Sequence, residues 1–154
     1  NPLPDLANAP EAIRLLQCRL GSRDCWCGRR DCVESWLSGP GLARTRADLG
    51  GPQESAEALV TAAKVGEIAA VRALDLYAWQ LAASLATVVN LLDPDCVVLG
   101  GGVSGVRDIY TLVPKRWDRF VFSDRVRTVL APAHHGDSGG VLGAARLGPA
   151  RPTA

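Results

Sequence analysis

Residues 90–104, which read NLLDPDCVVLGGGVS, indicate the fold class of this chain. Asp93-Pro94 is expected to end a helix, because a residue that precedes proline disfavours the helical conformation. Residues 96–99 are all apolar, and three consecutive glycines at 100–102 end the run. A short buried strand followed by a glycine turn and a helix is an α/β unit. The stretch therefore predicts a mixed α/β fold.

Helices dominate the rest of the expected structure. Residues 54–92 carry apolar residues three, four or seven apart, with Ser55 as a candidate cap and a break at Gly66. The remaining expectations are an irregular lead-in over 1–24 with a short helix at 11–16, a helix over 33–47 broken near 38–41, a helix over about 107–120, a strand over 127–130, a loop over 134–140, a helix over 141–147 and a tail over 149–154. Only two or three strands are visible, fewer than the roughly four to six of a usual sheet, so further strands are expected upstream.

Composition excludes several classes of protein. The 154 residues carry a formal net charge of +1, with 47% hydrophobic and 21% charged residues. This mix is typical of a globular domain, and the near-neutral charge gives no basic field toward nucleic acid. No apolar run reaches the roughly 18–20 residues of a membrane span, and no signal peptide opens the sequence. We therefore expect a cytoplasmic protein without nucleic-acid or membrane partners. The absence of methionine, even at position 1, favours an excised or processed chain.

Three of the five cysteines lie within residues 25–32, which read CWCGRRDC. Without a secretion signal, such a cluster indicates a metal site rather than a disulfide framework, and zinc suits three thiolates. Gly28 permits the turn that brings Cys25, Cys27 and Cys32 together. The candidates for a fourth ligand within the sequence are Cys18, His134 and His135. The alternative is three reduced, metal-free cysteines; a catalytic cysteine is disfavoured because no histidine or acid is evidently paired with one.

The glycine turn at 100–102 has two interpretations. After a strand and before a helix, its backbone N–H groups could face a nucleotide. It lacks the Gly-Lys-Ser/Thr of a Walker A loop and the spacing of a dinucleotide fingerprint. A plain strand-to-helix turn therefore stays open as the alternative.

Taken together, three motifs resemble the ROK family of repressors, open reading frames and sugar kinases. Residues 25–34, CWCGRRDCVE, followed by Ser38-Gly39, resemble its zinc-knuckle signature. Residues 90–104 resemble its second signature, and residues 135–145, HGDSGGVLGAA, resemble its C-terminal helix. The resemblance covers residues 1–148, with the knuckle at 25–32, helices and a nucleotide-side α/β unit over 54–148, and a tail at 149–154. One departure is Asp31, where the family has glycine; aspartate is among the residues that best tolerate positive φ.

This resemblance implies the C-terminal part of a sugar kinase with the actin/hexokinase-like (ribonuclease H-like) fold. It implies a structural zinc on Cys25, Cys27 and Cys32, with a histidine just upstream of Asn1 as the fourth ligand. Glu34 would contact the sugar. The residues on the nucleotide side would be Gly100, Gly101, Gly102 and Ser104.

The implied reaction is phosphoryl transfer from MgATP to a hexose. The resemblance places the aspartate base upstream and implies no catalytic residue within these 154 residues. We therefore expect the chain alone to be inactive. The opening Asn1-Pro2-Leu3-Pro4 resembles the fructokinase branch, which favours fructose, and the family implies a homodimer. Asp137 is expected to be a helix cap, Cys96 a buried strand residue, and the four tryptophans packing residues.

Two alternatives to the kinase remain. The same sugar-binding half could be the inducer sensor of a ROK repressor, whose helix-turn-helix would precede this sequence. A metal-binding interaction module would explain the cysteines but not the glycine turn or the final helix. The upstream sequence discriminates between the kinase and the repressor.

Overall fold

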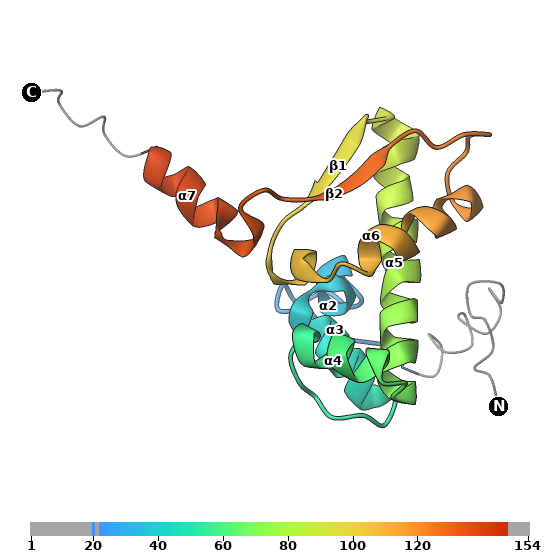
Figure 1. Cartoon of the computed structure of the whole chain (residues 1–154), viewed down its shortest axis with the longest axis vertical. Coiled ribbons are helices and arrows are strands. Elements are labelled where there is room, and N and C mark those ends of the chain that lie inside the picture. Colours follow the sequence, from blue (N-terminus) through green and yellow to red (C-terminus); the bar gives the residue numbers. More distant parts are fainter. Residues whose placement is uncertain (1–19, 21, 148–154) are drawn as a thin grey trace, which may run out of the picture.

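The computed structural model describes residue 20 and residues 22–147, and the expected helix at 11–16 and tail at 149–154 lie outside them. A long central helix, α5, runs along one side, with α2, α3 and α4 near its start and two strands near its end (Figure 1). The elements in chain order are α2 (Val33–Leu37), α3 (Gly39–Asp48), α4 (Ala56–Lys64), α5 (Ile68–Leu92), β1 (Cys96–Leu99), η2 (Gly102–Gly105), α6 (Ile109–Leu112), η3 (Pro114–Arg119), β2 (Val129–Pro132), η4 (Gly136–Ser138) and α7 (Gly139–Arg146).

The helical region over 54–92 forms as predicted. Ser55 caps α4 by accepting the N–H of Ala58 at 3.2 Å. Gly66 separates α4 from α5. Its φ is +84°, a conformation that would be strained for a residue with a side chain. Asp93 closes α5 in a left-handed conformation, with a φ of 41°, just before Pro94.

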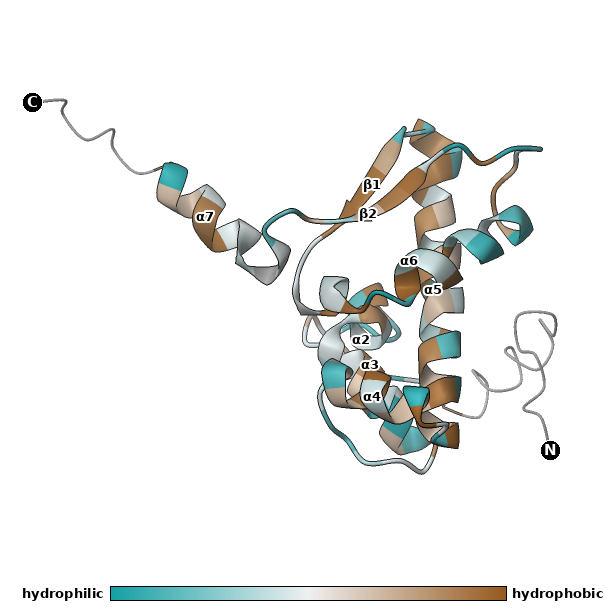
Figure 2. Ribbon diagram, viewed as in Figure 1, coloured by the Kyte–Doolittle hydropathy of each residue, from teal (hydrophilic) through white to brown (hydrophobic). Residues whose placement is uncertain are grey.

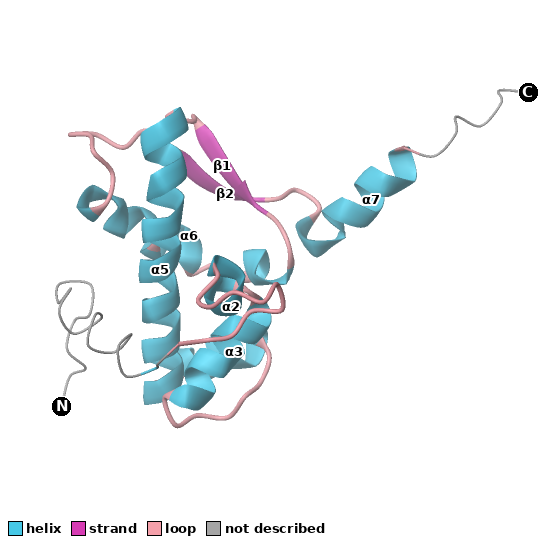
Figure 3. Ribbon diagram, turned by 180° about the vertical axis from the view of Figure 1, so that it is seen from behind, coloured by secondary structure: helices cyan, strands magenta, loops and turns pink. Residues whose placement is uncertain are grey.

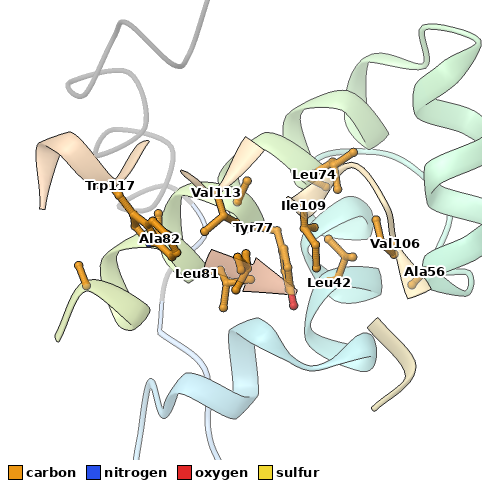
Figure 4. Close-up of a cluster of buried hydrophobic side chains, with 14 of the residues drawn as sticks. Leu42, Ala56, Leu74, Tyr77, Leu81, Ala82, Val106, Ile109, Val113 and Trp117 are labelled. Atoms are coloured by element: carbon orange, nitrogen blue, oxygen red, sulfur yellow. The ribbon is translucent and has the colours of Figure 1, made fainter. Parts of the chain in front are cut away.

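The hydrophobic core lies where α5 meets the other helices. Alanines on α5 allow α3, α4, α6 and η3 to approach its backbone closely. Figure 4 shows Trp117, Val113 and Ile109 of the later segments facing Tyr77 and Leu81 of α5. Burial of these apolar side chains is the main stabilising contribution to this core.

β1 and β2 form a parallel pair, with Cys96 opposite Val129 and Leu99 opposite Pro132 (Figure 3). β1 has the predicted bounds, whereas β2 begins two residues later than expected. Cys96 is exposed, so the expectation of a buried strand residue was wrong. Val98 and Val129 are 59% and 58% exposed, because the described residues supply only two strands and leave one sheet face uncovered.

The expected helix over 107–120 is two short segments instead, α6 and η3. Pro114 opens η3 and has no backbone N–H for a continuing α-helix. The final helix, α7, extends away from the body of the molecule and has no buried residue (Figures 1 and 2). Its exposed Val141 and Leu142 are apolar, as is the exposed Leu147 just after it. None of the described helices is both long and apolar enough to cross a membrane.

Candidate functional site

Residues 24–32 fold back on themselves as a short knuckle. Asp24 and Arg30 form an antiparallel bridge, and the Cys25 N–H donates to Arg29 O at 2.8 Å. The Gly28 N–H donates to Cys25 O at 3.0 Å, and Gly28 has a φ of +81°. This turn brings the three cysteines of the loop to one side.

The thiols of Cys25, Cys27 and Cys32 lie within 4.8 Å of one another, and Cys27 Sγ is 3.5 Å from Cys32 Sγ. Zn–S bonds of about 2.3 Å in a tetrahedron place sulfurs about 3.8 Å apart, so this spacing fits a soft metal ion. The Arg29 backbone N–H lowers the pKa of Cys27. Hydrogen bonding to the Cys27 thiol raises the pKa of Cys32.

Among the described residues this cluster offers three ligands and no fourth. His134 and His135 are exposed and lie outside the cluster. Their rings pack edge to face, with centroids 4.8 Å apart. Cys18 lies outside the described residues. A fourth ligand would therefore have to come from outside the described residues.

Asp31 stands in the left-handed region, with a φ of 55°. Its carboxylate accepts the Ser22 hydroxyl at 2.7 Å, the Arg23 N–H at 2.8 Å and the Trp36 indole N–H at 3.2 Å. The Arg23 N–H and the Ser22 hydroxyl lower the pKa of Asp31, in that order. Aspartate therefore tolerates the turn and also ties the knuckle to α2, which glycine could not do.

Arg23 is fully buried, with a side-chain exposure of 0%. Its guanidinium stacks on the Trp36 ring, 3.7 Å from the centroid. Burial lowers the pKa of Arg23, and the Asp48 carboxylate opposes that effect. The two terminal nitrogens donate to Ser35 O at 3.1 Å, Gly41 O at 3.0 Å, Thr45 Oγ1 at 3.0 Å and Asp48 Oδ2 at 2.8 Å. One side chain thus joins the segment just before the knuckle to both α2 and α3.

α2 and α3 meet in a tight elbow at Ser38, the expected break. The Ser38 hydroxyl caps α3 by accepting the Gly41 N–H at 3.2 Å. A Cβ on Gly41 would lie 2.8 Å from backbone atoms of Ser35 and Trp36, so only glycine allows this approach. The elbow fixes the first turn of α2, which carries Glu34.

Glu34 is exposed and lines a pocket of about 320 Å³. Trp26 stands beside it, and its indole N–H donates to Glu34 Oε2 at 3.3 Å. The pocket walls come from the knuckle, the elbow and the loop before α4; its other lining residues are Asp24, Cys25, Ser35, Ser38, Pro40, Gly41, Arg44 and Gln53.

The glycine turn has open space on its outer side. A Cβ on Gly100, Gly101 or Gly102 would meet nothing within 4 Å, and Gly101 has a φ of +83°. Ser104 is buried instead, and its hydroxyl donates to Gly101 O at 2.6 Å. Ser104 therefore shapes the turn from beneath.

A second pocket, of about 520 Å³, joins the glycine turn to the starts of α3 and α4. Gly102 and Val103 line one side, and the opposite side includes Pro40 and Gln53, which also line the pocket of Glu34. The buried Arg46 holds this side by donating to Glu54 Oε2 at 3.0 Å and Glu67 Oε2 at 2.9 Å. The two pockets are therefore neighbours.

Several of these residues were not predicted. Arg23 and Gln53 carry no local signal, because their roles depend on contacts distant in sequence. The packing expectation holds for the buried Trp117 and is wrong for Trp26, which is 86% exposed. The side chain of Asp137 lies outside the described structure, so its expected capping role is untested.

Comparisons with known proteins agree with the motifs. The ROK family model matches residues 14–151. An N-acetyl-D-glucosamine kinase of Pasteurella multocida (strain Pm70) is 36% identical over 124 residues, which are 80% of this chain and 41% of the relative. A ROK family glucokinase from Streptomyces griseus, solved in complex with glucose and AMPPNP, superposes with a TM-score of 0.68 at 26% identity, covering 80% of this chain and 46% of that one.

A ROK family transcriptional regulator, a homologue of the Escherichia coli MLC protein, superposes with a TM-score of 0.59 at 23% identity, covering 71% of this chain and 31% of its own. That likeness is one of fold. The chain spans about two fifths (41%) of the length of the curated relative it matches. Matched by the family model over 14–151, the chain belongs to the ROK family and has the actin/hexokinase-like fold of its sugar kinases.

Proposed function

We propose that this chain is the C-terminal part of an ATP-dependent hexose kinase. The observation that carries the proposal is the pair of neighbouring pockets, one lined by Glu34 and one by Gly102, which share Pro40 and Gln53. Phosphoryl transfer requires the sugar hydroxyl and the terminal phosphate to be held in line at close range. Two adjoining pockets suit that requirement. One is lined by the Glu34 carboxylate, and the other by Gly102 of the open turn together with Glu54 and Glu57.

Each group has a distinct task in this proposal. Glu34 accepts hydrogen bonds from sugar hydroxyls and so orients the ring. Gly100, Gly101 and Gly102 have no side chains, which allows the nucleotide to approach the backbone, while Ser104 keeps the turn in shape. Mg²⁺ bound with ATP would neutralise charge on the transferred phosphoryl group. The aspartate base that accepts the proton of the sugar hydroxyl, the 6-hydroxyl in this proposal, would lie upstream.

We further propose that Cys25, Cys27 and Cys32 hold a structural zinc ion. Their mutual spacing supports it, and thiolates are among the ligands that zinc prefers in structural sites. Zinc at this point would stiffen the loop between Arg23 and Glu34 without taking part in the reaction. The fourth ligand would come from a histidine just before Asn1.

The preferred sugar is the finer part of the proposal. The opening Asn1-Pro2-Leu3-Pro4 favours fructose, whereas the relatives named above act on N-acetyl-D-glucosamine or were solved with glucose. ATP-dependent ADP release should be measured with fructose, mannose, glucose and N-acetylglucosamine, on this chain and on the chain extended by its natural upstream sequence. We expect sugar-dependent ADP release only from the extended protein and none from this chain. Enzyme-like turnover by the 154 residues would refute the proposed inactivity of the chain.

The second candidate is the sugar-sensing domain of a ROK repressor, favoured only by the shared fold of the regulator. Sugar binding by the extended protein without ADP release, together with a helix-turn-helix upstream, would favour it over the kinase. A homodimer and a cytoplasmic location also remain proposals. Size-exclusion chromatography with light scattering of the extended protein tests the first, and subcellular fractionation tests the second.

A further inference from the structure

Trp26 is an unusual residue for its position. It lies between two clustered cysteines, yet its side chain is 86% exposed. A large aromatic side chain gains little by facing water, and such residues often serve as contact surfaces. Because it is so exposed, Trp26 adds little packing within the described structure.

Trp26 nevertheless makes one polar contact. Its indole N–H donates to Glu34 Oε2 at 3.3 Å, and both residues line the pocket of about 320 Å³. A carboxylate has two acceptor oxygens. The indole N–H occupies one acceptor site of Oε2. Oε1 can therefore accept hydrogen bonds from a sugar.

We propose that Trp26 binds and orients the sugar in this pocket, an inference that rests on the proposed function. Its N–H holds the Glu34 carboxylate in one orientation, and its ring forms an apolar wall against the C–H face of a bound hexose. The two tasks are separable, since phenylalanine keeps an aromatic ring and loses the N–H, while alanine loses both.

Sugar and ATP kinetics of the extended protein test this inference. For Trp26→Phe we expect the sugar KM to rise about three- to tenfold, the size of an ordinary net hydrogen bond, because this contact is long and exposed to water. Trp26→Ala should raise it by a further factor of about two to ten, because the ring is also lost. The ATP KM should stay unchanged, since Trp26 does not line the pocket of Gly102.

Phe122→Ala is the matched control, because Phe122 is 98% exposed and lines neither pocket. Its sugar KM should equal that of the wild type. Zinc content and Tm should stay constant in all three variants, which separates a role in sugar binding from a role in folding. Sugar should also change the intrinsic tryptophan fluorescence of the wild type without ATP, and Trp26→Ala should abolish that change.

The possible failures are distinguishable. If the wild type neither binds nor phosphorylates any sugar, the proposed function fails and this inference fails with it. If the wild type phosphorylates a sugar while both Trp26 variants match Phe122→Ala, the inference alone is overturned. It is overturned equally if the Trp26 variants change only Tm or oligomeric state, since Trp26 would then contact protein instead of sugar.

Discussion

Gly41→Ala is the sharpest test of the elbow that carries Glu34. A Cβ at this position would lie 2.8 Å from Ser35 O and from Trp36 C and O, whereas ordinary contact begins near 3.4 Å, so α2 would have to retreat by about 0.6 Å. Alanine gains up to about 1 kcal/mol in helix propensity over glycine. The obstacle is rigid backbone and Arg23 bridges both helices, so we expect overpacking to dominate, with a net loss of about 1–3 kcal/mol.

The assay is thermal unfolding together with sugar kinetics of the extended protein. For a protein of about 150–250 residues that loss lowers Tm by about 2–12 °C, and for the larger extended protein we expect the lower part of that range. Displacement of α2 should also raise the sugar KM without changing the ATP KM. Gly39→Ala is the matched control, because its Cβ would meet only Val103 Cγ2 at an ordinary 3.6 Å. A Gly41→Ala protein as stable as Gly39→Ala would refute this account of the elbow.

Three further predictions concern the metal, the core and pH. Cys32→Ser should lose stoichiometric zinc in a chromophoric chelator assay, whereas Cys96→Ser, outside the cluster, should retain it; full retention by Cys32→Ser would contradict the assigned ligand set. Leu76→Ala, at a fully buried position on α5, should cost about 2–5 kcal/mol in urea unfolding, and a loss below about 1 kcal/mol would contradict the described core. Burial raises the pKa of Tyr77 to about 12, so the folded state disfavours its phenolate: this contribution to stability is complete below pH of about 10 and is lost as pH rises toward 12. The ultraviolet absorbance of tyrosinate should therefore rise later in folded than in urea-unfolded protein, and a midpoint near 10 in protein still folded by circular dichroism would refute the buried phenol.

The elements that sequence predicted well are set by local chemistry. Pro94 and Gly66 end helices, and the apolar run at 96–99 forms a strand with the predicted bounds. β2 was misplaced by two residues, because its register depends on pairing with β1 rather than on its own residues. Cys96 was misjudged for a related reason: the burial of a strand depends on what covers the sheet, which no local pattern specifies.

The candidate site was predictable only in part. The motif identified the cysteines and Glu34, and the structure brings the three thiols together. The supporting residues have no comparable signal. Arg23 reads as one more surface arginine, yet it is buried and joins two helices through contacts 12 to 25 residues away in sequence. Asp31 reads as a departure from the family pattern, yet it forms three hydrogen bonds.

The two pockets differ in how far these residues complete them. The pocket of Glu34 is supported by contacts made within 22–48, including the buried Arg23 and the close approach at Gly41. The glycine turn is supported from beneath by Ser104, whose carbonyl accepts the Tyr110 hydroxyl at 2.7 Å. Its outer side is open, and it follows a sheet with one exposed apolar face. We therefore expect any lack of activity in the isolated chain to arise from the open nucleotide side, while the elbow keeps its geometry.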